Sequence, residues 1–161
     1  YNLVGCQTHL KFGEQKRVFS MIPALRNAEF VRYGVMHRNT FLDSPRLLDA
    51  TYALKAEPRI RFAGQMTGVE GYIESTASGW VAGVAAAMEV LGKPMPQLDR
   101  FTAVGALASY ISDHTVTKFQ PMNINFGIIE PLGCKIKGKR EKNAKISERA
   151  LERIESLKGE L

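Results

Sequence analysis

Residues 60–75 read IRFAGQMTGVEGYIES and indicate a strand joined to a helix by a glycine-rich turn. The predicted strand spans Arg59–Ala63, and the predicted helix runs from about Tyr72 to Leu91. Glycine permits backbone torsions that a side chain would block, and the free N–H groups of a first helical turn attract anionic or electron-rich groups. The turn is therefore a candidate site for a phosphate or for the electron-rich edge of a flavin.

The glycine spacing by itself does not decide between a ligand site and a structural turn. Gly64, Gly68 and Gly71 follow the pattern G-x3-G-x2-G, which differs from the dinucleotide fingerprint and from the Walker phosphate loop. A plain tight turn before a glycine-rich helix explains the same residues. Glu74 falls in the first helical turn, where a carboxylate favourably meets the positive helix end, and we interpret it as a helix-terminus residue. Both alternatives stay open at this level.

The rest of the chain predicts a mixed α/β protein. Hydrophobic alternation indicates strands, and apolar residues at helical spacing indicate helices. The helix after the glycine-rich turn holds many small residues, which predicts that it is buried on most sides. The further predicted strands are Tyr1–Leu10, Ala28–Met36 and Thr51–Lys55, and the further predicted helices are Phe12–Ile22, Ala103–Ile111 and Lys139–Leu157.

Composition limits the classes of protein and of site. The chain has 161 residues, of which 45% are apolar, so it can bury a core; its net charge of +6 suits an anionic partner such as nucleic acid or a phosphate-bearing cofactor. The longest run poor in charge, Gly71–Leu91, contains two Glu and many small polar residues, so we expect a soluble, cytoplasmic protein without a membrane span. The chain begins at Tyr1 without an initiator Met, and we expect it to be part of a longer protein.

Neither cysteine nor histidine indicates a metal site. Cys6 and Cys134 are far apart and lack a CxxC partner, so neither a disulfide framework nor a zinc site is predicted. The three histidines His9, His37 and His114 are scattered and show no ligand spacing. We therefore expect no bound metal.

Two polar segments are candidates for ligand contact. Residues 37–39 close a predicted strand with hydrogen-bonding groups, and residues 119–127 mix apolar anchors with amide side chains. A solvated turn explains the first segment equally, and a proline-fixed connection over the core explains the second. The candidate residues are His37, Arg38, Asn39, Gln120, Asn123 and Asn125.

The C-terminal segment is basic. Residues 135–161 hold nine Lys or Arg against five Glu, and the predicted helix there would place Ile146, Ala150, Ile154 and Leu157 on the protein body. Its solvated cations are suited to phosphate contacts with RNA, although a capping helix with solubilising charges fits the pattern equally well. The candidate RNA contacts are Lys135, Lys137, Lys139 and Lys142.

Four stretches together resemble a known enzyme family. They are GCQTHLKFGEQKRVF (5–19), AEFVRYGVMHRNTF (28–41), FAGQMTGVEGYIESTASGWVAG (62–83) and FQPMNINFG (119–127). They resemble the C-terminal part of the bacterial folate- and FAD-dependent tRNA (uracil-5-)-methyltransferase family. This resemblance implies an α/β fold, the C-terminal portion of a two-dinucleotide-fold flavoprotein that is Rossmann-like and of the glutathione-reductase type. It implies that residues 1–42 end an inserted α+β domain, that residues 43–132 return to the FAD-binding domain, and that residues 133–161 form a basic helical tail.

The resemblance also implies a reaction. Reduced FAD and methylenetetrahydrofolate would methylate C5 of the T-loop uridine of tRNA, with NAD(P)H as reductant, and residues 37–39 and 119–127 would face folate or uridine. The family's functional cysteines precede Tyr1, so the catalytic residues are unknown here, Cys6 inherits no role, and the segment alone is not expected to be active. The alternatives are a flavoprotein that adds carboxymethylaminomethyl groups to wobble uridines and a non-catalytic RNA-binding module. The implied FAD contacts are Gly64, Gln65, Met66, Gly68, Val69, Glu70 and Gly71.

Overall fold

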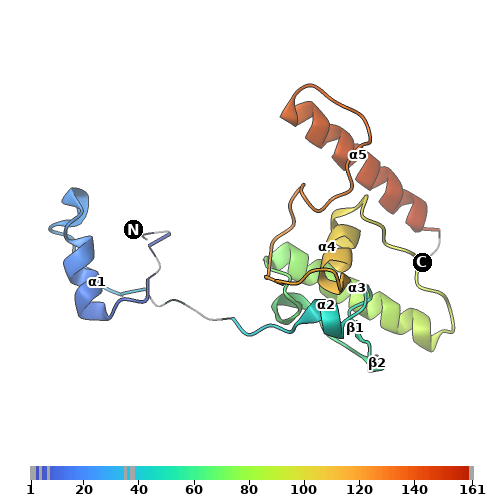
Figure 1. Cartoon of the computed structure of the whole chain (residues 1–161), viewed down its shortest axis with the longest axis horizontal. Coiled ribbons are helices and arrows are strands. Elements are labelled where there is room, and N and C mark those ends of the chain that lie inside the picture. Colours follow the sequence, from blue (N-terminus) through green and yellow to red (C-terminus); the bar gives the residue numbers. More distant parts are fainter. Residues whose placement is uncertain (1–2, 4, 7, 35, 37–38, 160–161) are drawn as a thin grey trace. The chain divides into compact units, whose positions relative to one another are not determined.

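The computed structural model describes residues 3, 5–6, 8–34, 36 and 39–159, and the chain divides into two compact units, 1–39 and 40–161 (Figure 1). Helices and one small sheet occur in the same chain, as the α/β prediction requires at its coarsest level. In chain order the elements are α1 (Phe12–Phe19), the 3₁₀ helix η1 (Pro23–Leu25), α2 (Ser44–Leu47), β1 (Ala53–Leu54), β2 (Glu57–Arg61), the 3₁₀ helix η2 (Gly64–Thr67), α3 (Tyr72–Val90), α4 (Ala103–Ser112) and α5 (Lys139–Leu157).

The first unit is organised by aromatic side chains around α1. Tyr33 stacks on Phe12 and on Phe30, with ring centroids 5.7 and 5.6 Å apart. The buried Gln15 amide of α1 donates hydrogen bonds to the carbonyls of Leu10 and Gly34, both at 2.8 Å. These contacts tie the segments on either side of α1 to the helix.

The strands predicted over Tyr1–Leu10 and Ala28–Met36 are wrong for the residues that the structure describes, because none of these is in a strand. Phe30 and Tyr33, which are three positions apart, contact each other, whereas strand residues that share a face are separated by an even number of positions. Phe30 and Tyr33 pack instead on Phe19 and Phe12 of α1. The helix predicted for Phe12–Ile22 is confirmed as α1 but ends earlier, at Phe19.

The second unit contains a two-stranded antiparallel sheet of β1 and β2, with Ala53 opposite Arg61. The short strands predicted near residues 51–55 and 59–63 are confirmed with shifted bounds. The sheet described here is a hairpin rather than part of a parallel sheet. It therefore does not itself provide the carboxyl edge at which doubly wound proteins bind ligands.

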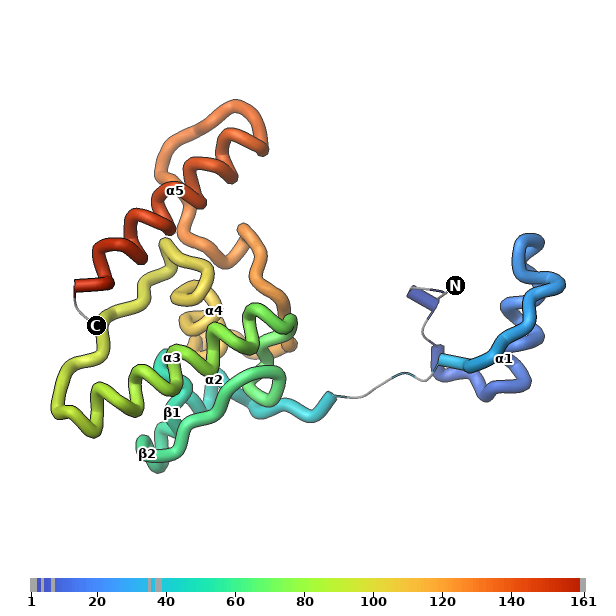
Figure 2. Tube along the Cα trace, turned by 180° about the vertical axis from the view of Figure 1, so that it is seen from behind, coloured from blue at the N-terminus to red at the C-terminus, as the bar shows by residue number. Residues whose placement is uncertain are grey.

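Helix α3 packs through one face only. Ser78, Val81, Ala85 and Met88 are buried, whereas Val90 on the opposite side is 86% exposed. Figure 2 shows α3 running beside α4, and side chains of these two helices share one core with Leu48, Tyr52 and Val69. The prediction that α3 is buried on most sides is wrong for this chain, because small residues permit close packing but do not supply a partner.

Tyr52 provides a test of this core. Its side chain is 1% exposed, and burial raises the pKa of its phenol well above the usual value near 10. A raised folded-state pKa means that stability is full below about pH 10 and falls as the pH rises above it, by up to about 1.4 kcal/mol per pH unit. Tyr52→Phe removes this titration, so we expect its free energy of unfolding to fall less between about pH 8 and about pH 11.

Urea unfolding at the two pH values measures this difference. Tyr72→Phe is the matched control, because Tyr72 is 95% exposed and its removal should leave the alkaline loss of stability unchanged. Equal alkaline losses in the wild type and in Tyr52→Phe would contradict the prediction.

Candidate functional site

The glycine-rich turn, residues 64–71, connects β2 to α3 and depends on three unusual backbone conformations. Gly64, Gly68 and Gly71 have φ values of +71°, +84° and +100°, in the region that favours glycine. Gly68 ends η2, and Gly71 precedes the first residue of α3. The turn and helix start predicted from the sequence are therefore confirmed, and the glycines are required by backbone geometry.

Hydroxyl groups hold this turn in place, and sequence reasoning missed them. Ser78 of α3 accepts a hydrogen bond from the backbone N–H of Gly64 at 2.7 Å. Thr67 donates to the carbonyl of Gly64 at 2.7 Å, and Ser44 donates to the carbonyl of Thr67 at 2.9 Å. Because Ser44, Thr67 and Ser78 are buried, these bonds are shielded from water. Ser and Thr residues close to the glycine-rich turn in the sequence could have indicated these hydrogen bonds.

The predicted FAD contacts differ in accessibility. Gln65, Met66 and Gly71 are exposed, and the side chain of Met66 is 51% exposed. Val69 is fully buried in the core, so its side chain is unavailable to a ligand. The remaining members of the predicted set, Gly64 and Glu70, are partly buried, and Gly68 is buried.

The structure brings the second candidate segment, residues 119–127, against the glycine-rich turn. Val69 and Met122 form a parallel bridge. Met122 donates its backbone N–H to the carbonyl of Gly68 and accepts from the N–H of Glu70, both at 3.0 Å. Two segments separated by about fifty positions thus form one surface.

Side chains add to this junction. Asn123 donates its amide to the carbonyl of Glu70 at 3.1 Å, and Glu74 accepts from the backbone N–H of Ile124 at 3.4 Å. Glu74, which we interpreted as a helix-terminus residue, therefore also contacts the second segment. Asn125 accepts from the N–H of Gly127 at 2.9 Å and so shapes a turn. Gln120, Asn123 and Asn125 are all exposed.

Phe119, the first residue of the second segment, belongs to an aromatic cluster. It packs edge-on against Phe41, with ring centroids 5.9 Å apart, and at a tilt against Tyr110, with ring centroids 5.4 Å apart. A Cβ atom on Gly68 would lie only 2.3 Å from the Phe119 ring. The missing side chain at Gly68 therefore makes room for Phe119 rather than for a ligand.

The first candidate segment, residues 37–39, lies only partly within the described residues. His37 and Arg38 lie outside the described residues, and Asn39 is an exposed residue of the first unit. The assembled candidate site consists of the open part of residues 64–71 together with Asn123 and its neighbours in the second unit.

The start of α3 combines free backbone N–H groups with a carboxylate. No side chain caps the first turn of α3, which suits an electron-rich acceptor. The carboxylate of Glu74 lies at this helix start, because a Cβ on Gly71 would be 2.1 Å from its Oε2 atom. A carboxylate repels a second anion, so this helix start suits a neutral electron-rich group better than a phosphate.

Two hollows are lined by other residues. One, of about 350 Å³, lies in the first unit beside Gln15. The other, of about 400 Å³, is lined by residues 97–101 with Ser109 and Glu130. Neither hollow is lined by residues of the candidate site.

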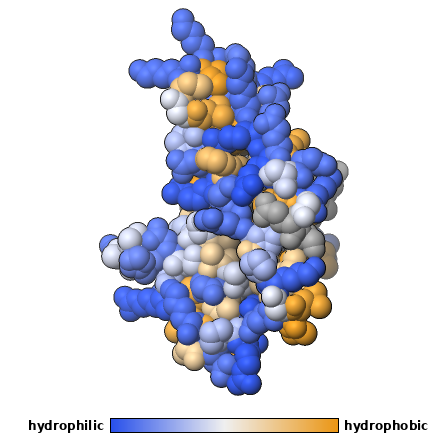
Figure 3. All heavy atoms as spheres, turned by 90° about the vertical axis from the view of Figure 1, so that its right-hand side faces the viewer, coloured by the Kyte–Doolittle hydropathy of each residue, from blue (hydrophilic) through white to orange (hydrophobic). Residues whose placement is uncertain are grey.

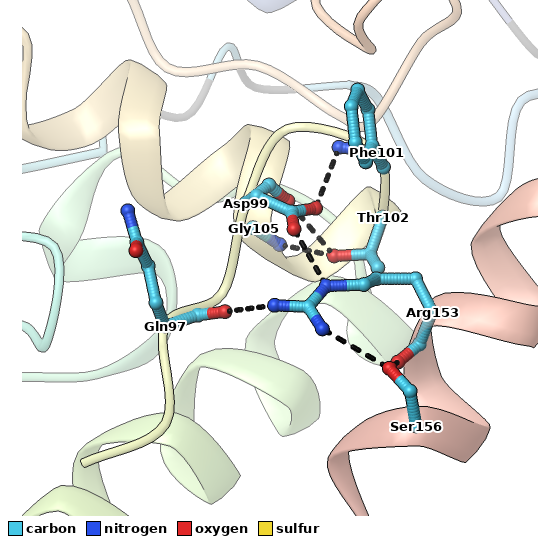
Figure 4. Close-up of polar contacts among 7 residues, drawn as sticks. All are labelled: Gln97, Asp99, Phe101, Thr102, Gly105, Arg153 and Ser156. Carbon is cyan, nitrogen blue, oxygen red and sulfur yellow. Dashed lines mark hydrogen bonds and ion pairs between the residues drawn. The ribbon is translucent and has the colours of Figure 1, made fainter. Parts of the chain in front are cut away.

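The basic tail forms α5 with the predicted bounds, and the predicted apolar side faces the protein. Ile146 and Leu157 are each 3% exposed, and Ile146 packs with Ala106 of α4. Arg153 of α5 pairs with Asp99 at 2.6 Å and donates to the carbonyl of Gln97 at 3.3 Å (Figure 4). The four candidate RNA contacts Lys135, Lys137, Lys139 and Lys142 are all exposed.

The described part of the chain contains neither a metal cluster nor a membrane-spanning helix. No group of three or more His, Cys, Asp or Glu side chains is placed to hold a metal ion among these residues. None of the helices described has both the length and the apolar character needed to cross a bilayer.

Comparison with known proteins supplies relatives for the whole chain. Methylenetetrahydrofolate–tRNA-(uracil-5-)-methyltransferase TrmFO of Acetivibrio thermocellus is 62% identical over 94% of this chain, and the proteins of the same name from Ligilactobacillus salivarius and Listeria monocytogenes are 59% and 56% identical over 98% and 100%. These alignments confirm the resemblance inferred from the four stretches. The chain spans only 35–37% of the length of these relatives.

A family comparison covers the N-terminal part of the chain. The sequence model described as "Glucose inhibited division protein A" matches residues 1–94. This range includes the glycine-rich turn and α3 and ends before residues 119–127 and α5. Because more than half of the chain matches, the chain belongs to the glucose inhibited division protein A family.

Proposed function

We propose that this chain is the C-terminal segment of a flavoenzyme that methylates C5 of the T-loop uridine of tRNA. The observation that carries the proposal is identity of 56–62% with proteins named as methylenetetrahydrofolate–tRNA-(uracil-5-)-methyltransferases over nearly the whole chain. It favours methyl transfer over wobble-uridine modification, because the relatives are named for the former. The proposed full-length fold is a two-dinucleotide-fold flavoprotein, with residues 1–42 ending an inserted domain and residues 43–132 returning to the FAD domain.

The geometry of the second unit supports a role in orienting the cofactor. FAD and methylenetetrahydrofolate supply the hydride and the one-carbon unit, with NAD(P)H as the proposed reductant. Residues 65–66 and 71 offer an exposed backbone surface to the flavin ring, and the free N–H groups at the start of α3 would hold its electron-rich edge. Asn123 and Gln120 would offer amide groups to folate or uridine, and the full-length chain would supply the other walls.

Flavin content and methyl transfer of the full-length protein test this function. We expect a yellow protein that transfers the folate one-carbon unit to position 5 of uridine in a tRNA transcript. A colourless protein that binds tRNA without modifying it would instead support the RNA-binding module. A yellow protein that modifies only a wobble uridine would support the other flavoprotein.

Residues 37–39 remain proposed contacts on the folate or uridine side, through His37, Arg38 and Asn39. Arg38→Ala in the full-length enzyme should depress methyl transfer more than flavin content, because a guanidinium at that position would bind substrate rather than FAD. An unchanged rate with saturating folate and tRNA would remove these residues from the site.

The exposed lysines at the start of the tail are the proposed RNA contacts. Changing Lys135, Lys137, Lys139 and Lys142 to Gln should lower the slope of log affinity against log salt by about 0.7 to 0.9 for each RNA phosphate that the variant no longer neutralises. Titration of tRNA at several salt concentrations measures this slope. An unaltered slope and affinity would assign the tail a structural role only.

A further inference from the structure

Basic residues are concentrated at the start of α5, where cations destabilise a helix. Residues 135–145 contain six Lys or Arg and one Glu, whereas residues 146–158 contain three Lys or Arg and three Glu. The last turn of α5 contains no basic residue. Because the start of a helix carries positive partial charge, cations there weaken the helix and cations at its end strengthen it. Stability of the helix therefore does not explain the cations in the basic end, residues 135–145.

The arginines in the second half of α5 face the protein. Arg149 donates to the carbonyls of Pro131 at 2.9 Å and of Glu130, and its guanidinium lies 4.5 Å from the centre of the Phe101 ring. Arg153 donates to Asp99, as Figure 4 shows, and its side chain is only 29% exposed. Both arginines are thus occupied by the connections on either side of α4.

The solvent-facing side of this second half is acidic. Glu148, Glu152 and Glu155 are exposed, and Glu155 pairs with Lys158 at 2.6 Å. Like charges three and four positions apart on a helix repel each other and would also repel an RNA backbone. The outer surface of α5 therefore changes from basic to acidic along its length.

The basic end is available to a partner. All six of its cations are exposed, and none of them takes part in an ion pair with the residues that the structure describes. In Figure 3 long hydrophilic side chains project from the top of the molecule, where α5 begins. The six cations are Lys135, Lys137, Lys139, Arg140, Lys142 and Lys145.

We propose that RNA contacts α5 only at this basic end, that Arg140 and Lys145 belong to the contact surface, and that Arg149 and Arg153 are positioning residues. The inference rests on the proposed function for its choice of RNA as the polyanion. Arg149 holds Glu130 and Pro131, which belong to the connection between residues 119–127 and α5. The arrangement would present tRNA to the enzyme in a fixed orientation.

Salt titrations of tRNA binding to the full-length protein test the contact surface. Arg140→Gln with Lys145→Gln should reduce the slope of log affinity against log salt by about 1.4 to 1.8, which corresponds to two phosphate contacts. The matched control, Lys93→Gln with Lys158→Gln, removes two exposed cations elsewhere and should leave the slope unchanged. Equal changes in both double variants would mean that only net charge matters and would overturn the proposal.

Two further double variants distinguish residues that contact RNA from residues that position α5. Glu148→Gln with Glu152→Gln should leave the affinity for tRNA unchanged. A rise in affinity of about threefold or more would show that RNA extends along the whole helix, and would overturn the proposal that it contacts only the basic end. Arg149→Met with Arg153→Met should lower affinity at constant slope, because it loosens α5 without removing a phosphate contact. A fall in its slope by about 0.7 to 0.9 per arginine would make these residues RNA contacts and overturn their assignment.

These binding measurements do not depend on methyl transfer. A protein that gives the expected slopes but transfers no methyl group would contradict the proposed function and support this inference. A protein that methylates uridine but shows an unchanged slope in Arg140→Gln with Lys145→Gln would do the reverse.

Discussion

Gly68→Ala is expected to lower the free energy of unfolding by about 2 to 6 kcal/mol, the sum of backbone strain and overpacking. The residue has φ +84°, and an added Cβ would lie 2.3 Å from Cζ and 2.6 Å from Cε1 of Phe119. The Phe119 ring is itself held by Phe41 and Tyr110, so it has little room to move. Urea unfolding of the full-length protein measures the loss.

Two comparisons identify the cause of that loss. Gly83→Ala in α3 is the control, because a Cβ there meets nothing within 4 Å, and it should stabilise the helix by up to about 1 kcal/mol. In a Phe119→Leu background the cost of Gly68→Ala should be smaller, because the smaller side chain relieves the collision. Strictly additive effects of the two substitutions would contradict the packing explanation.

Gly71→Val is expected to lower the flavin content of the purified full-length protein by about tenfold, a loss of about 1.4 kcal/mol or more in cofactor binding. Gly71 has φ +100° at the start of α3, and an added Cβ would lie 2.1 Å from Oε2 of Glu74 and 2.8 Å from Nδ2 of Asn123. Valine would therefore displace the two side chains that join the glycine-rich turn to residues 119–127. Absorbance in the flavin band relative to protein concentration measures the occupancy.

Gly138→Val is the matched control for this substitution. Gly138 also precedes a helix, has φ +98°, and has open space where a Cβ would be placed. Gly138→Val therefore imposes similar backbone strain at a distance in sequence from the candidate site. The flavin content of this variant should equal that of the wild type. Normal flavin content in Gly71→Val, or an equal loss in Gly138→Val, would contradict the assignment of the flavin-side turn.

The glycines of the glycine-rich turn differ in their surroundings. The sequence predicts that its glycines allow a cofactor to approach the backbone. In the structure Gly68 makes room for Phe119, whereas Gly71 lies at the exposed junction with Asn123. Gly68 is therefore needed for the fold, and a contact of Gly64 or Gly71 with the cofactor stays a prediction.

The sequence by itself determined the features that depend on neighbouring residues. Helix α5 has the predicted bounds Lys139–Leu157, and α3 and α4 begin at the predicted residues, because helical hydrogen bonds and apolar spacing are local properties. The glycine-rich turn was also predictable, since positive φ values favour glycine wherever they occur. The four stretches that carry the family resemblance were equally readable without coordinates.

Only the tertiary structure decided which of these local features meet. Strand formation requires a partner elsewhere in the chain, so alternation alone misassigned residues 28–36. The bridge between Val69 and Met122, the contact of Glu74 with Ile124 and the anchoring of Arg153 by Asp99 each join residues about fifty positions apart. Such contacts are set by the packing of whole elements, because no local pattern specifies the partner of a backbone group or of a charge.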